Sequence, residues 1–222
     1  MSEQEAETYH QAQVETLAGS AADMVCAITM NYVEEAIGIT RAAQRADMPV
    51  AISFTVETDG NLPTGQSLKA AIEQVDEATS GHPCYYMINC AHPTHLEHLL
   101  TEGGLWLDRI RGLRANASRK SHAELNESPQ LDVGNPVELA IEYARLTKPL
   151  SRLNVMGGVV ARTTAMWNRS LKLARRCSAL RPNNRLQWTA FRRLRAAAPR
   201  IPEGFDLILL RVSGLGDLID GR

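Results

Sequence analysis

The stretch Cys84-Tyr-Tyr-Met-Ile-Asn-Cys-Ala-His-Pro-Thr-His-Leu-Glu-His98 decides the expected fold. Its apolar run predicts a buried strand, and the Pro-containing turn after Cys90 leads into a helical pattern that begins near Thr94. Cys90 is therefore expected at the carboxyl end of a strand. In barrels of alternating strands and helices, catalytic groups collect at that edge.

Apolar strands and amphipathic helices alternate on both sides of this stretch. Strands are expected at 22–30, 49–56, 84–89, 113–117 and from 153 onward, and helices at 3–18, 33–46, 67–79, 94–101 and 135–146, with a short helical turn at 105–110. This alternation predicts a parallel sheet covered by helices. An α/β barrel is favoured over an open doubly wound sheet, because no Gly-rich nucleotide loop follows any strand.

Length and composition are those of a globular protein. The 222 residues, 44% of them hydrophobic, suffice for one large domain, and no stretch approaches the roughly 18 apolar residues of a membrane span. The first ten residues lack the apolar core of a secretory signal, and the four cysteines show no short paired spacing. We therefore expect a cytoplasmic protein with reduced cysteines and no membrane partner.

The balance of charge changes near Gly157. Residues 1–156 carry 11 Lys and Arg against 21 Asp and Glu, whereas residues 157–222 carry 13 against 4, and 12 of those 13 are Arg. All six histidines lie in the first part. Two segments of one evolved domain seldom differ this much, so we predict a barrel fragment over 1–158 and an unrelated, weakly structured Arg-rich tail over 159–222.

Cys90 allows more than one interpretation. A buried structural thiol is the simplest. With His92, His95 and His98, it offers the thiolate and imidazole ligands that suit zinc, but one helical turn cannot easily place four ligands around one ion, and surface histidines are favoured. Glu57 follows the second predicted strand, where a carboxylate either binds a substrate amine or belongs to an acidic turn.

Four segments together resemble the homocysteine S-methyltransferase family: Ser53-Phe-Thr-Val-Glu-Thr-Asp-Gly, Met87-Ile-Asn-Cys-Ala-His-Pro, Leu113-Arg-Ala-Asn-Ala-Ser and Leu153-Asn-Val-Met-Gly-Gly. They occur in the family's order, and the resemblance covers about residues 5–158. It implies a (β/α)8 TIM barrel in which three cysteine thiolates hold zinc at the carboxyl end. Cys90 matches one of them. The other two belong to a Gly-Gly-Cys-Cys-Gly motif, and Val159 and Val160 stand in their places.

The resemblance implies a metal-assisted alkylation of a thiol. Zinc would bind the homocysteine sulfur as thiolate, which would attack the methyl group of a sulfonium, ammonium or pterin donor and give methionine. Homocysteine and a methyl donor are thus the implied partners. Glu57, Asn89 and Asn116 lie in the matching segments and are the expected substrate-binding residues. One thiolate alone should not hold zinc tightly, so we expect this chain to lack activity.

The chain departs from the family pattern in two further ways. Its first predicted strand corresponds to the barrel's fourth, so strands 4 to 8 are expected and the first three strand-helix units are absent. Ile28 stands where many members place a Glu that binds the substrate amine. Five strands cannot close an eight-stranded barrel, and we expect open edges that favour aggregation or self-association.

A change of reading frame accounts for the missing cysteines. Codons for Val159–Asn168, read one base earlier with permitted synonymous choices, encode Cys-Cys-Gly-Thr-Asp-His-Arg-His-Val-Glu, the family's continuation. Met166 and Trp167 each have a single codon, so the shifted frame must encode Val as the next-to-last residue of this string. The codon of Asn168 then forces Glu as the last residue. We hypothesise that a net loss of one base near the Gly158 codon put the tail out of frame.

Two alternatives from other function classes remain open. The tail, with Trp188 and Phe191 beside Arg-rich residues 192–195, could bind nucleic acid through phosphate contacts and stacking, although it carries no recognised binding motif. The chain could also be a non-catalytic barrel remnant that pairs with another chain. A last strand is expected within Phe205–Val212.

Overall fold

The computed structural model describes residues 1–101, 103–158 and 207–210. The elements are α1 (Glu3–Ala18), β1 (Met24–Met30), α2 (Val33–Arg45), β2 (Val50–Thr55), α3 (Leu68–Thr79), β3 (Tyr85–Asn89), η1 (Pro93–Leu96), α4 (Glu97–Thr101), η2 (Leu105–Arg109), β4 (Ile110–Ala115), α5 (His122–Asn126), α6 (Pro136–Leu146), β5 (Val155–Gly158) and β6 (Leu207–Leu210). The predicted alternation of strands and helices is confirmed. Within the described residues, no helix is long and apolar enough to cross a bilayer.

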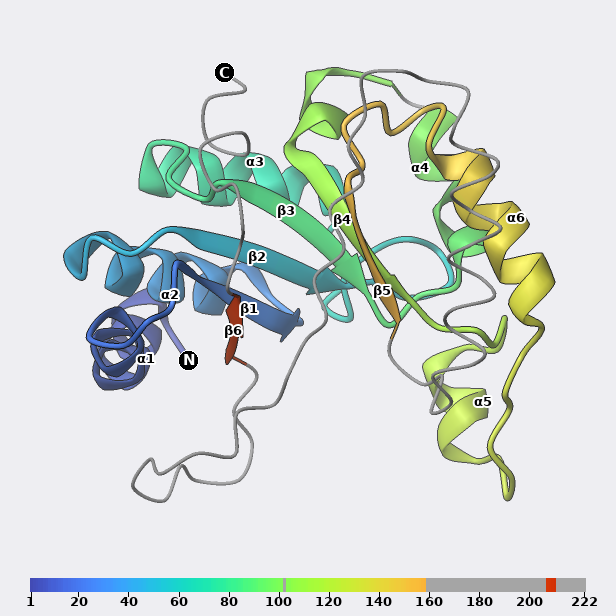
Figure 1. Ribbon diagram of the computed structural model, residues 1–222, viewed down its shortest axis with the longest axis horizontal. Coiled ribbons are helices and arrows are strands. Elements are labelled where there is room, and N and C mark those ends of the chain that lie inside the picture. Colours follow the sequence, from blue (N-terminus) through green and yellow to red (C-terminus); the bar gives the residue numbers. More distant parts are fainter. Residues whose placement is uncertain (102, 159–206, 211–222) are drawn as a thin grey trace.

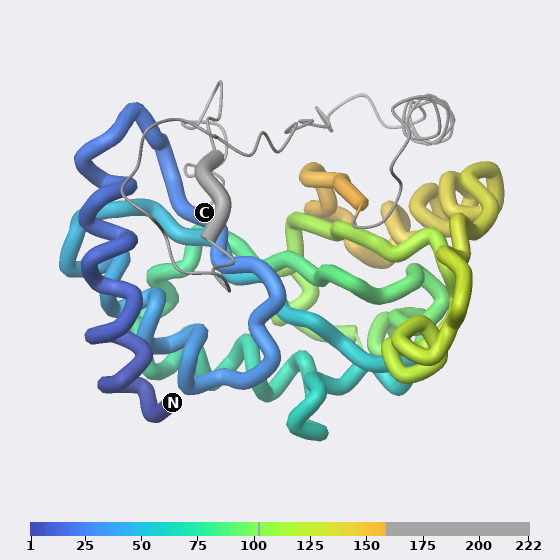
Figure 2. Tube along the Cα trace, turned by 90° about the horizontal axis from the view of Figure 1, so that it is seen from below, coloured from blue at the N-terminus to red at the C-terminus, as the bar shows by residue number. Residues whose placement is uncertain are grey.

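Five parallel strands form a curled half-barrel (Figure 1). Their order is β5-β4-β3-β2-β1, and every neighbouring pair among them is parallel. Sequence order thus follows spatial order, and Figure 2 shows α1 and α6 at opposite sides of the molecule. The α/β class and a partial barrel are confirmed. The assignment of these strands to positions 4 to 8 of a TIM barrel stays a prediction.

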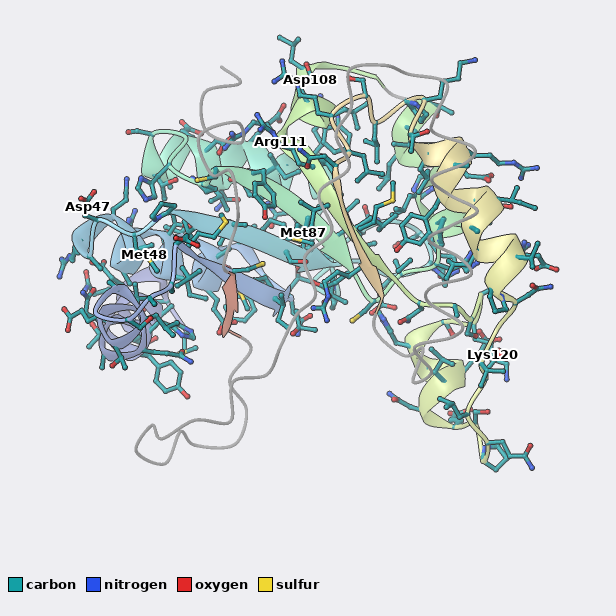
Figure 3. All side chains as sticks on the ribbon, in the orientation of Figure 1. Asp47, Met48, Met87, Asp108, Arg111 and Lys120 are labelled. Atoms are coloured by element: carbon teal, nitrogen blue, oxygen red, sulfur yellow. The ribbon has the colours of Figure 1, made fainter. Side chains whose placement is uncertain are left out.

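The two faces of the sheet contribute to two separate apolar clusters, because side chains alternate along each strand. One face packs with the helices in the larger core, as Phe54 and Ile88 do. The other face forms a smaller cluster, which we call the strand-only cluster because its buried members among the described residues all come from strands: Met24, Cys26, Ala51, Tyr85, Met87 and Val155. Met87, on the central strand, is labelled in Figure 3.

The outer edge of β1 is covered by β6. Met24–Ala27 pair with Leu207–Leu210 in antiparallel register. The expectation of two open sheet edges is therefore wrong for the β1 edge. β6 lies within the stretch where a last strand was expected, whereas the remaining predictions for the tail concern residues outside the described ones.

The register brings the carboxyl ends of the strands into one row. Asn89 lies beside Arg114, and Arg114 lies beside Gly157. One residue farther along, Cys90 and Gly158 follow Asn89 and Gly157 at the same carboxyl edge of the sheet, on either side of β4. Figure 3 shows Asp108 and Arg111 at the opposite, amino end of β4.

Candidate functional site

Asn89, the last residue of β3, braces the carboxyl ends of three strands. Its fully buried amide accepts from Ser53 Oγ at 2.6 Å and from the Thr29 backbone N–H at 3.1 Å through Oδ1. Its Nδ2 donates to Thr55 Oγ1 at 2.9 Å. The structure thus places Asn89 in an internal brace, directly before Cys90. Its predicted contact with a substrate stays a prediction.

Cys90 leaves the strand in a left-handed backbone conformation, with φ of 60°, and Thr29 at the neighbouring strand end has φ of 61°. This region costs a non-glycine residue about 1–2 kcal/mol, and such conformations concentrate at functional sites. The Cys90 N–H donates to the Arg114 carbonyl at 3.1 Å. Its own carbonyl oxygen accepts from Asn116 Nδ2 and from His122 Nε2, both at 2.8 Å.

His122 connects Cys90 to Glu57. The ring atom Nδ1 lies 3.0 Å from Glu57 Oε1, and the two side chains are 28% and 36% exposed. Two predicted substrate-binding residues, Glu57 and Asn116, therefore belong to one hydrogen-bonded cluster with Cys90. We call Glu57, Cys90, Asn116 and His122 the edge cluster.

Sequence reasoning missed both α5 and its first residue, His122. The helix has five residues and buries none of them, so it has no apolar periodicity to detect. The available signal was the capping box: the Ser121 side chain accepts from the Glu124 N–H, and Glu124 in turn accepts from the Ser121 N–H.

The histidines after Cys90 do not surround its thiol. His92 is only 1% exposed, its Nδ1 pairs with Thr94, and burial lowers its pKa to about 4. His95 donates from Nε2 to a backbone carbonyl at 2.9 Å, and His98 is exposed. The prediction of surface histidines is therefore wrong for His92.

A zinc ion does not fit the described residues. Among them, no group of three or more His, Cys, Asp or Glu side chains could hold a metal. Cys26 is buried in the strand-only cluster, where burial raises the pKa of its thiol to about 12, and Cys84 precedes β3 at the amino end. A structural or catalytic zinc site needs at least three protein ligands, and Cys90 supplies one. Val159 and Val160 lie outside the described residues.

Residues 1–177 match the sequence model of the homocysteine S-methyltransferase family. The matched range is well over half of the chain and contains the whole edge cluster. It also extends past Gly158 over the two valines. A search of curated proteins found no match.

Proposed function

The chain belongs to the homocysteine S-methyltransferase family, and from this premise we propose that its carboxyl edge binds homocysteine but does not support methyl transfer in the sequence as it stands. The observation that carries the proposal is the position of Cys90 in the edge cluster, at the same edge of the sheet as Gly158, while the described residues hold no group of three or more His, Cys, Asp or Glu side chains that could bind a metal. A cytoplasmic location agrees with the free thiols of Cys26 and Cys84.

Glu57 is the residue we assign to the substrate ammonium group. Ile28, near the end of β1, is packed against the strand-only cluster and offers no charge. Glu57 follows the next strand, is partly exposed, and shares the edge cluster with Cys90. A carboxylate in this place attracts an ammonium group through a charge-assisted hydrogen bond.

Asn116 supports the same location for the substrate. Its Nδ2 donates to the Cys90 carbonyl, whereas its buried Oδ1 has no hydrogen-bond partner among the described residues. A buried acceptor without a donor costs about 1–3 kcal/mol, which a ligand or a water that donates would recover. We therefore keep Asn116 as a proposed substrate contact.

Loss of methyl transfer follows from the ligand count. Family members depend on zinc to bind and activate the homocysteine sulfur, and Val159 and Val160 provide no ligand atom where the family has two cysteines. A single thiolate leaves a tetrahedral zinc ion without its remaining protein ligands. The binding surface and the reaction are thus separable in this chain.

Zinc content and methionine formation, measured on one preparation, test the proposal. We expect much less than one zinc per chain and no methionine from L-homocysteine with S-methylmethionine, S-adenosylmethionine or betaine as donor. The C90S variant is the matched control and should behave identically. A tightly held zinc that C90S abolishes, or methionine formed by the parent chain alone, would contradict the proposed loss of activity.

A further inference from the structure

His122 lies between the two groups that the proposed function requires. A carbonyl oxygen only accepts, so the contact between Nε2 and the Cys90 oxygen at 2.8 Å is a bond that the ring donates. Nδ1 faces Glu57 Oε1 at 3.0 Å. The same ring therefore fixes the backbone of Cys90 and the side chain of Glu57.

The bond to Cys90 acts on a strained residue. Cys90 has a left-handed φ of 60°, and its carbonyl is held by side chains from two different segments, Asn116 and His122. These two bonds offset the steric cost of the left-handed conformation. Removal of one donor should let Cys90 relax and change the accessibility of its thiol.

The bond to Glu57 sets the direction of its carboxylate. Among the described residues, Oε1 has His122 as its partner, and Oε2 has none. A carboxylate that is anchored through one oxygen presents the other in a fixed position. This arrangement suits an ammonium group, which has several donors and needs an oriented acceptor.

We propose that His122 is a positioning residue with two separable tasks: Nε2 holds Cys90 in its left-handed conformation, and Nδ1 orients Glu57 toward the ammonium group of an amino-acid substrate. The inference rests on the proposed function and deepens it. It identifies the ligand as an α-amino acid whose side chain ends near Cys90, such as L-homocysteine or its hydroxyl analogue L-homoserine.

A purely structural role for His122 makes a different prediction. α5 has no buried residue, so His122 also ties this helix to the edge of the sheet. If that tie were its whole contribution, any substitution would loosen α5, and all properties of the site would change together. Two isosteric substitutions separate the roles, because Gln places an amide donor near Nε2 and Asn places one near Nδ1.

The test measures alkylation of Cys90 by iodoacetamide, resolved from the other cysteines by peptide mass spectrometry, with and without L-homoserine. H122Q should keep the Cys90 rate within about twofold of the parent but lose most of the protection by L-homoserine. H122N should raise the rate at least about threefold and keep the protection. 4-Hydroxybutyrate, which lacks the ammonium group, should protect none of the proteins.

Each remaining outcome counts for or against the inference. The inference is overturned if both variants melt like the parent and H122Q and H122N have the same effect on the Cys90 alkylation rate and on the protection by L-homoserine. It is also overturned if neither variant changes either readout. E57Q supplies a further check, since it should abolish protection by L-homoserine. If L-homoserine does not protect the parent chain, the proposed substrate is wrong, whereas the H122N to H122Q rate ratio still decides whether His122 positions Cys90.

Discussion

The chemistry of single residues is concentrated at Asn89 and Cys90, which are adjacent in the sequence but held by different partners. Asn89 is bound to Ser53 and Thr55, whereas the Cys90 carbonyl is bound by side chains that follow β4. A fully buried amide thus fixes the strand ends, and the next residue is left partly exposed at the edge. Substitutions at Asn89 should therefore affect mainly stability, whereas substitutions around Cys90 should affect mainly the chemistry of the site.

Asn89→Ala should destabilise the fold strongly. The substitution leaves the Ser53 hydroxyl, the Thr29 N–H and Thr55 Oγ1 without their common partner, and we expect a loss of at least about 2 kcal/mol in the free energy of unfolding. Ser53→Ala, which removes one of the three bonds, should cost about 1 kcal/mol. Urea denaturation measures both, and equal losses for the two variants would contradict a separate contribution from the bonds to Thr29 and Thr55.

Val159→Cys together with Val160→Cys should create a zinc site. Both positions come after Gly158 in the sequence, and Gly158 ends β5 at the carboxyl edge where Cys90 follows β3. We expect bound zinc to rise to about one ion per chain. Addition of C90S to the double variant should reverse the gain.

Among the elements, α1 and α2 depend on a close approach at Gly38. A Cβ at Gly38 would lie 2.6 Å from the Glu7 backbone nitrogen and 2.7 Å from the Glu3 carbonyl oxygen, so the helices would have to separate. Gly38→Ala should therefore destabilise the protein by about 1–3 kcal/mol despite the better helix propensity of Ala. Gly19→Ala, whose new Cβ meets nothing closer than 3.6 Å, is the control and should be nearly neutral by thermal melting.

The same pair of helices makes stability depend on pH. His10 Nε2 lies 3.2 Å from Glu35 Oε1, and the hydrogen bond from His10 is the main reason that the pKa of Glu35 lies below its usual 4.5. A carboxyl group with a lowered pKa stabilises the fold above about pH 4.5, and this contribution disappears as the pH falls through the folded-state value. The free energy of unfolding, measured by denaturation between pH 6 and 3, should therefore fall less steeply with decreasing pH in Glu35→Gln than in the parent. An unchanged pH dependence would contradict a contribution from this pair.

The elements were also the level at which the sequence was most informative. The helices expected at 3–18, 67–79 and 135–146 match α1, α3 and α6 to within one residue at each end. The start of β4 was missed because Arg111 interrupts its apolar run while remaining half-buried. His122 was missed because its role comes from its contacts with Cys90 and Glu57, which precede it by 32 and 65 positions. A local sequence pattern cannot indicate contacts over such separations.

At the scale of the whole molecule, a strand late in the chain covers the first strand of the half-barrel. β6 pairs with Met24–Ala27, although a pattern of parallel strands alone predicts an open edge there. The Val25 N–H donates to Pro49 on the β2 side. Cys26 and its partner Ile208 are therefore the residues whose backbone groups face each other across the β1–β6 ladder. Ile208→Pro removes this backbone donor and should expose the edge. We expect concentration-dependent association in size-exclusion chromatography with light scattering, and a variant that stays monomeric would argue against edge protection by β6.

The gene provides a second test at this scale. If a one-base loss produced the tail, the codons for Val159–Asn168 should contain the wobble bases that encode the family's continuation when read one base earlier. Sequencing of both strands decides the matter. Codons incompatible with that string would leave the change of charge near Gly157 without this explanation.

The central claim is that Cys90 stands at the family's metal-binding edge without its two partners. Zinc per chain, measured by mass spectrometry of metals in the parent, V159C/V160C and V159C/V160C/C90S proteins, tests it most directly. The account predicts much less than one zinc in the parent, about one in the double variant, and loss again in the triple variant. One tightly bound zinc in the parent, or none in the folded double variant, would contradict it.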